Sequence, residues 1–167
     1  MKIVVASAAA LVVSGCASMG MGGGPAATAA LRPTQGNNVA GSVTFTQRGD
    51  KVHVSANVTG LKPGAQQAIH VHEKGDCSSA DGMSAGGHFN PASKPHGPQD
   101  GEHHAGDMPN LVADAYGNAN ASFDLSGVTV QGFEGKGVIV HRDPDDYKSQ
   151  PAGNAGPRLA CGVIRKS

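Results

Sequence analysis

The clearest pattern in the chain is an alternation of apolar and polar residues with a period of two. Residues 39–46 alternate between valine or phenylalanine and small or polar side chains, and residues 51–58 repeat the alternation after the turn Arg48-Gly49-Asp50. A period of two puts successive side chains on opposite faces of a strand, and a glycine turn between two such runs is typical of a hairpin. The pattern predicts a β-hairpin over 39–58.

Shorter runs of the same kind follow along the chain. Strands are expected over 67–73, 111–116, 119–125, 137–141 and 161–165, the second and third forming a hairpin around Gly117-Asn118. Two long segments, 74–108 and 142–158, are read as loops, the first because it is rich in Gly, Pro and His. Since no run longer than a turn or two has a helical period, the sequence predicts an all-β antiparallel sandwich or barrel.

The N-terminus has the pattern of an export signal. Met1-Lys2 precedes an apolar run over 3–13, which is too short to span a bilayer as a mature helix. The small residues before Cys16 resemble a bacterial lipoprotein box, so we expect cleavage after Gly15 and acylation of the Cys16 thiol. The alternative is an ordinary signal peptide that leaves this thiol free. Residues 17–32 are mostly Gly, Ala, Met and Ser without a strand or helix period, which indicates a flexible tether. The predicted organisation is a signal over 1–15, a tether over 16–33 and one domain over 34–167.

Composition narrows the functional classes. The 167 residues include 13 basic and 13 acidic side chains, so the chain has no broad cationic surface for a nucleic-acid backbone. The three cysteines leave an odd thiol in an exported protein. If Cys16 carries a lipid, Cys77 and Cys161 remain as one pair.

Candidate chemistry lies in the eight histidines. His70 and His72 lie two apart on a predicted strand, so both imidazoles point to one face. Further candidates are His88 on a glycine-rich turn, His96, His104 and Asp107 at intervals of eight, eight and three, and His141 at the end of an apolar strand. A site of three nitrogens and one oxygen suits zinc, whereas an all-imidazole site suits copper. Ligand type alone leaves open whether one ion or two are bound.

Each candidate also has a plainer interpretation. His53 lies on the polar face of the first hairpin and is interpreted as a solvent-exposed residue. Spacing does not choose between His103 and His104. By itself Asp107 is equally typical of a turn, and Arg158 of a surface ion pair with a nearby aspartate.

Taken in order, six motifs resemble those of copper-zinc superoxide dismutases, in the exported lipoprotein form of bacteria. They are His70-x-His72, Gly-His88-Phe-Asn-Pro, His96-Gly-Pro, His104-x-Gly-Asp107, Val-His141 and Gly-Pro-Arg158-Leu-Ala-Cys161-Gly-Val. The resemblance runs from about Val39 to Ile164. It implies a flattened eight-stranded Greek-key barrel, an immunoglobulin-like sandwich with two long functional loops.

The resemblance also implies a role for each matched residue. One copper ion per subunit is expected on His70, His72, His88 and His141, and one zinc ion on His88, His96, His104 and Asp107. His88 then bridges the two metals. Asp145 is expected to join the free ring nitrogens of His70 and His96, and Cys77 and Cys161 to form a disulfide. Arg158 is expected to dock the superoxide anion.

The activity that this resemblance implies is disproportionation of superoxide to dioxygen and hydrogen peroxide, by alternate reduction and reoxidation of the copper ion. Lys74, Lys94 and Lys148 are candidate guides for the anion. A copper carrier and a zinc-stapled structural lipoprotein are the rival functions, but neither needs both metal sites together with Arg158. The chain is expected in the cell envelope, anchored by the lipid on Cys16, and Ala17 favours the outer membrane. A second copy of the chain is a candidate partner.

Overall fold

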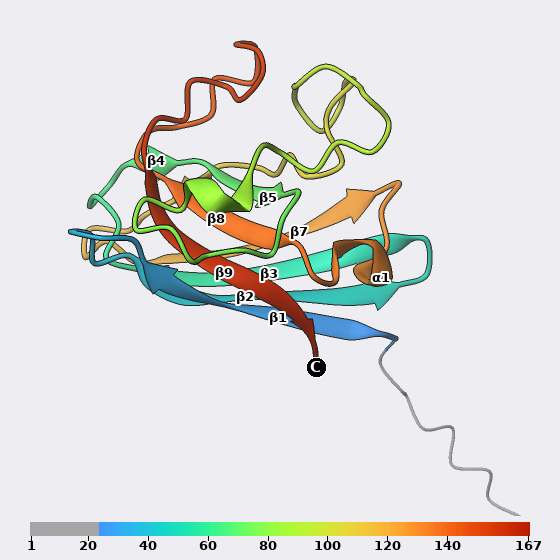
Figure 1. Cartoon of the computed structure of the whole chain (residues 1–167), viewed down its shortest axis with the longest axis horizontal. Coiled ribbons are helices and arrows are strands. Elements are labelled where there is room, and N and C mark those ends of the chain that lie inside the picture. Colours follow the sequence, from blue (N-terminus) through green and yellow to red (C-terminus); the bar gives the residue numbers. More distant parts are fainter. Residues whose placement is uncertain (1–23) are drawn as a thin grey trace, which may run out of the picture.

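The computed structural model describes residues 24–167, and its architecture is all-β (Figure 1). The strands are β1 (Ala26–Pro33), β2 (Ala40–Arg48), β3 (Lys51–Thr59), β4 (Gln66–Gln67), β5 (Ile69–His72), β6 (Leu111–Val112), β7 (Ala119–Ser126), β8 (Gly137–His141) and β9 (Arg158–Lys166). A single 3-10 turn, η1 (Met83–Ala85), and one short helix, α1 (Val130–Phe133), complete the regular structure of the described residues. The prediction of an all-β fold is confirmed.

Seven strands form one curled antiparallel sheet in the order β5-β8-β9-β1-β2-β3-β7. The remaining pair, β4 and β6, forms a separate ribbon of two residues per strand. The described residues therefore form a seven-stranded sheet and a two-stranded ribbon. The family resemblance implies a barrel of eight strands. In no helix of residues 24–167 is there an apolar stretch of the length that a bilayer crossing requires.

The core lies inside the curl of this sheet. Phe45 of β2 is fully buried and meets Phe133 of α1 edge to face, with ring centroids 5.4 Å apart. Such a contact is favoured because the positive edge of one ring meets the negative face of the other. Thr129 caps the start of this helix, because its hydroxyl accepts a hydrogen bond from Gly132 N. The alternating apolar residues of β2 and β3 supply much of the remaining core, and the hairpin predicted over 39–58 is confirmed.

Strand β1 corrects the tether predicted over 16–33. Residues 26–33 pair with β2 on one side and with β9 on the other. Ala27, Ala29 and Leu31 are buried and alternate with more exposed neighbours. Alanine differs little in hydrophobicity from its small neighbours, so the period of two is weak in this part of the sequence. Hydrogen bonding to β2 and β9 along both edges fixes the strand instead. The predicted signal, Cys16 and the first part of the tether lie outside the described residues.

The second predicted hairpin is also wrong in its pairing. Leu111 and Val112 pair with β4, and residues 119–126 pair with β3. The turn after β6 bonds to a distant loop, because Gly64 N donates to Asp114 O at 2.9 Å. The turn itself closes locally, because Asp114 N donates to Asn118 O at 2.8 Å, but beyond it each arm pairs with a different strand.

The last strands and the two long loops follow the prediction more closely. The run predicted over 67–73 is divided between β4 and β5, and β8 has the predicted bounds. The strand predicted over 161–165 is part of the longer β9. Segments 74–108 and 142–158 are irregular apart from η1, a few bridging residues and the start of β9. In the view of Figure 1 part of each segment extends above the sheet.

Candidate metal centre

The candidate histidines converge where β5 and β8 meet the two long loops. Their backbones are brought together by isolated bridges that pair His70 with Asp107 and His72 with His88. His70 and His72 are buried on β5, and His141 is buried at the end of β8. The structure thus assembles residues up to 71 positions apart into one cluster below the surface.

The first group consists of His70, His72, His88 and His141. In three of these rings one nitrogen is hydrogen-bonded to a group outside both metal groups, whereas His88 Nδ1 bonds Asp107 of the second group. His70 Nε2 lies 2.7 Å from an oxygen of Asp145, His72 Nδ1 lies 2.9 Å from Gly86 O, and His141 Nδ1 lies 3.1 Å from Gly156 O. Since a carbonyl or carboxylate oxygen accepts, each of these nitrogens carries the proton and the opposite nitrogen keeps its lone pair.

The other nitrogen of each of the four rings is buried and lacks a hydrogen-bond partner. These atoms are His70 Nδ1, His72 Nε2, His88 Nε2 and His141 Nε2, and the ligand atoms of the group all lie within 4.8 Å of one another. An orphaned buried polar atom costs free energy, and four of them around one point are explained if an ion accepts their lone pairs. An all-imidazole set fits copper.

The second group consists of His88, His96, His104 and Asp107. Asp107 lies with one oxygen 2.8 Å from His88 Nδ1 and the other 3.0 Å from His96 Nδ1. His104 Nδ1 lies 3.4 Å from His88 Nδ1. Three nitrogens and one carboxylate fit the tetrahedral preference of zinc. His88 belongs to both groups and presents Nε2 to the first and Nδ1 to the second.

Asp145 joins the two groups through their outer nitrogens. One carboxylate oxygen lies 2.7 Å from His70 Nε2 and the other 2.8 Å from His96 Nε2. Its main chain is held by Asn110, whose side-chain amide donates to Asp145 O at 2.9 Å and accepts from Asp145 N at 2.8 Å. The sequence has no signal that singles out Asn110, because its partner lies 35 residues away.

Burial sets the charge state of the metal-free cluster. Desolvation, with the nearby His88, lowers the pKa of His70 to about 4 although Asp145 opposes the shift. Desolvation, with His70, lowers the pKa of His141 to about 3, and burial also lowers the pKa of His72 well below its usual value. These imidazoles are therefore neutral at neutral pH, the form that binds a metal.

His96 of the second group has the opposite balance, whereas burial lowers the pKa of His104. Burial disfavours a charged His96, but its contacts with Asp107 and Asp145 outweigh burial and raise its pKa to about 9. Burial likewise disfavours ionisation of both carboxyl groups, yet hydrogen bonds from the histidines hold the pKa values of Asp107 and Asp145 well below the usual range. Both carboxylates are thus anionic, and a dication held by the second group would balance their charge in place of the proton of His96.

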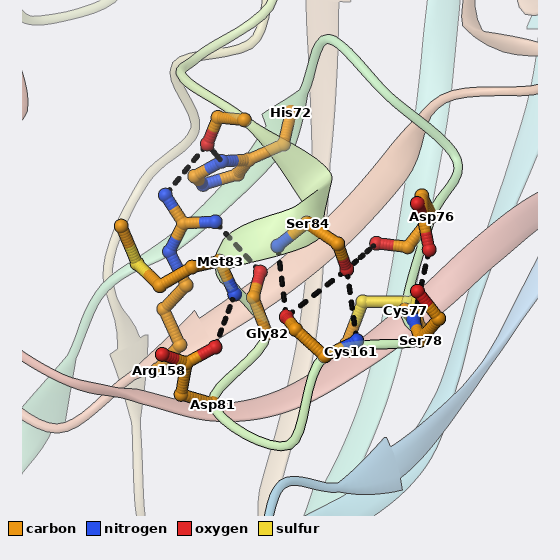
Figure 2. Close-up of a disulfide and its surroundings, with 12 residues drawn as sticks. His72, Asp76, Cys77, Ser78, Asp81, Gly82, Met83, Ser84, Arg158 and Cys161 are labelled. Carbon is orange, nitrogen blue, oxygen red and sulfur yellow. Dashed lines mark hydrogen bonds between the residues drawn. A yellow bond between two sulfur atoms is a disulfide. The ribbon is translucent and has the colours of Figure 1, made fainter.

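A cavity of about 1290 Å³ opens above the first group and reaches His72, His88, His141 and Arg158. Arg158 begins β9, and its guanidinium donates to Gly82 O at 2.8 Å and to Gly86 O at 2.6 Å. Gly86 O also accepts from His72, so Arg158 and a ring of the first group share one carbonyl (Figure 2). Burial lowers the pKa of Arg158, and the negative charge of nearby Asp81 partly opposes this shift. These bonds use two of the five guanidinium donors and fix the cation beside the cluster.

The disulfide between Cys77 and Cys161 confirms the predicted pairing. Its Cα atoms are 5.7 Å apart, and it closes a span of 84 residues. Figure 2 shows the bridge beside the turn that carries Gly82. Ser84 Oγ donates to Asp76 O at 2.8 Å within the same turn. The disulfide therefore anchors to β9 the segment whose carbonyl groups hold Arg158.

The remaining candidates lie elsewhere. Lys74, Lys94 and Lys148 are absent from the residues that line the large cavity, where Arg158 and Asp81 are the charged side chains of the described chain. His53 faces outward on β3 and lies 2.7 Å from Asp124, as expected of an ordinary surface histidine.

The pair His103 and His104 is separated by the fold. His104 is buried in the second group, whereas His103 Nδ1 lies 2.8 Å from Gly101 O.

The sequence profile of one family matches residues 39–164, and its description is copper/zinc superoxide dismutase. The chain belongs to this family. Its relatives include two proteins of Aquifex aeolicus (strain VF5). Superoxide dismutase [Cu-Zn] 2 is 43% identical over 148 residues, covering 83% of this chain and 86% of the relative. Superoxide dismutase [Cu-Zn] 1 is 41% identical over 134 residues, covering 75% and 79% respectively.

Family membership extends to solved structures. A double mutant of a SOD-like protein from Bacillus subtilis superposes with a TM-score of 0.74 at 34% identity, covering 83% of this chain and 96% of that chain. The family match starts at residue 39, so strand β1 lies ahead of it, although β1 is an interior strand of the sheet. For a copper/zinc superoxide dismutase, the two groups that share His88 are the expected place for both metals.

Proposed function

We propose that this protein disproportionates superoxide to dioxygen and hydrogen peroxide at the cavity above His88, and that it does so in the cell envelope. The observation that carries the proposal is the sharing of His88 between an all-nitrogen group and a group that includes Asp107. A structural zinc protein has no need of the first group, and a carrier has no need to bury both groups behind one shared ring.

Each group supplies one part of the chemistry. Copper on His70, His72, His88 and His141 supplies the change of oxidation state, and zinc on the second group supplies a fixed positive charge. The chain itself keeps the rings of His70, His72 and His141 neutral and Asp107 anionic. Asp145 accepts hydrogen bonds from the outer nitrogens of His70 and His96, which leaves the inner nitrogens free to face the ions.

Arg158 binds the substrate anion. Its guanidinium lines the cavity beside the rings of the first group, and two backbone carbonyl groups fix its position. A small anion that enters the cavity meets a fixed cation with donors to spare, and charge-assisted hydrogen bonds then orient it.

His88 Nε2 is the atom of the chain suited to carry a proton to the second superoxide. This atom is buried and free of hydrogen bonds, and its residue lines the cavity. The other nitrogen of the same ring lies 2.8 Å from Asp107. The ring therefore stays anchored on one side while the other side gains and releases a proton.

The test uses the chain without residues 1–15, loaded with both metals, and measures superoxide decay against the same concentration of free copper. We expect faster decay than with free copper. Arg158→Ala should lower the rate roughly 10- to 100-fold, the value of a lost hydrogen bond to a charged group. Arg142→Ala is the matched control, since Arg142 is exposed and pairs with Asp143 outside the cavity lining. A rate no higher than that of free copper, or an unchanged rate in Arg158→Ala, would contradict the proposal.

The envelope location rests on the N-terminal sequence. A charged Met1-Lys2, a short apolar run and Cys16 after small residues support export and lipid attachment. Labelled palmitate should enter the full chain, and Cys16→Ser should abolish the labelling. Cell fractionation then distinguishes the outer membrane, favoured by Ala17, from the inner one. A second copy of the chain is the candidate protein partner, and sedimentation of the unlipidated chain measures whether it forms a dimer.

A further inference from the structure

One side chain of the second long loop holds the backbone of a predicted zinc ligand. Gln150 Oε1 accepts from His96 N at 2.8 Å, and Gln150 Nε2 donates to His96 O at 2.8 Å. The primary amide thus pairs with both main-chain groups of one residue, as a neighbouring strand would. The two residues are 54 positions apart.

These two bonds matter because the chain around His96 has no regular structure of its own. Residues 94–98 belong to no strand or helix, and His96 is buried. Among residues 24–167, Gln150 is the hydrogen-bond partner found for the main chain of His96. A buried N–H and C=O left without partners would each cost about 1–3 kcal/mol, so the amide supplies what a sheet would supply elsewhere.

The ring of His96 is held at the same time from the other side. Its Nε2 lies 2.8 Å from Asp145, and its Nδ1 lies in the second group near Asp107. Backbone and ring together leave His96 little freedom to rotate or shift. Zinc demands near-tetrahedral geometry, so a ligand fixed in advance costs less ordering when the ion binds.

The loop that carries Gln150 is also a wall of the substrate cavity. Gln150, Pro151 and Ala152 line that cavity. Next to them, Gly153 has a φ of 63°, and a Cβ there would overlap both Asp145 and His96. The cavity wall therefore packs directly on the zinc ligand and on the carboxylate that links the two metal groups.

We propose that Gln150 is a positioning residue of the zinc site, which fixes His96 through its backbone and joins the cavity wall to the zinc group. The inference rests on the proposed zinc group of His88, His96, His104 and Asp107. It assigns the residue a part in zinc affinity and none in contact with superoxide.

The experiment measures metal affinity in the chain without residues 1–15. Gln150→Leu removes both hydrogen bonds at similar volume. Gln150→Glu keeps the acceptor for His96 N but sets a carboxylate against His96 O. Gln66→Leu is the matched control, because Gln66 is an exposed residue of β4 with no side-chain hydrogen bond in the described structure. Zinc affinity is measured by competition with a chromophoric chelator, and cobalt bound in place of zinc reports ligand geometry through its visible absorption.

We expect Gln150→Leu to weaken zinc about 10-fold, at the lower end of the range for residues that support metal ligands. Gln150→Glu should weaken zinc at least as much. The cobalt spectrum should change in both variants, while Gln66→Leu matches the wild type and copper affinity stays within twofold in all three. A purely structural role would lower copper and zinc affinity together and leave the cobalt spectrum of the saturated site unchanged.

Two results would overturn the inference. One is a zinc affinity within twofold of the wild type in Gln150→Leu. The other is an equal loss of copper and zinc affinity, since that would report general loosening of the fold. Neither readout depends on superoxide chemistry, so a wild-type chain that binds both metals but fails to consume superoxide would refute the proposed function and leave this inference standing.

Discussion

Removal of the disulfide should cost this protein a large share of its stability. The bridge closes a span of 84 residues. In the chain-entropy model a loop of this length restricts the unfolded chain by roughly 4–5 kcal/mol at 25 °C. Typical domains are stable by only about 5–15 kcal/mol. The double variant Cys77→Ala/Cys161→Ala, without metals, should therefore unfold at a much lower urea concentration than the wild type.

The assay is equilibrium urea unfolding followed by circular dichroism. The slope of the transition should rise in the variant, because the unfolded chain without the bridge exposes more surface. Wild-type protein treated with a phosphine reductant should match the variant, and the reductant should leave the variant unchanged. A loss of less than about 1 kcal/mol would refute the reasoning, since it would mean that the bridge barely restricts the unfolded chain.

Three further outcomes follow from the site and the core. Asp145→Asn presents an amide to one of two ring N–H groups and should weaken zinc 10- to 100-fold by chelator competition, whereas Asp124→Asn on the outer face should not. The metal-free chain should lose stability in urea as the pH falls from 6.5 toward 3. His70 and His141 have folded pKa values of about 4 and about 3, so in that interval the unfolded chain binds more protons than the folded chain. Constant stability over this interval would contradict the conclusion that burial lowers these pKa values. Phe45→Ala should cost about 3–5 kcal/mol in the same urea assay, since its fully buried ring packs on the aromatic ring of α1.

Much of the fold follows from local pattern, and its failures have a common cause. The hairpin over 39–58 is readable because valine and phenylalanine alternate with polar residues, and that contrast is the signal of a half-buried strand. Strand β1 has the same geometry, but alanine at 27 and 29 gives almost no contrast. Strand β1 is ordered by pairing with β2 and β9, and a short stretch of sequence around residues 26–33 does not show that pairing.

The membership of the site was within reach of the sequence, because the ligands lie in short motifs whose order along the chain is distinctive. His70-x-His72, for example, needs only the period of a strand to point two rings the same way. Tertiary structure alone decided which nitrogen of each ring is free, since the bonds that settle it run from His72 to Gly86 O and from His70 to Asp145. It alone revealed Asn110 and Gln150, whose amides act across 35 and 54 residues on the backbone of other loops. A side chain that bonds to the backbone can do so whatever residue its partner is, so the sequence does not reveal the pair and only the folded chain shows it.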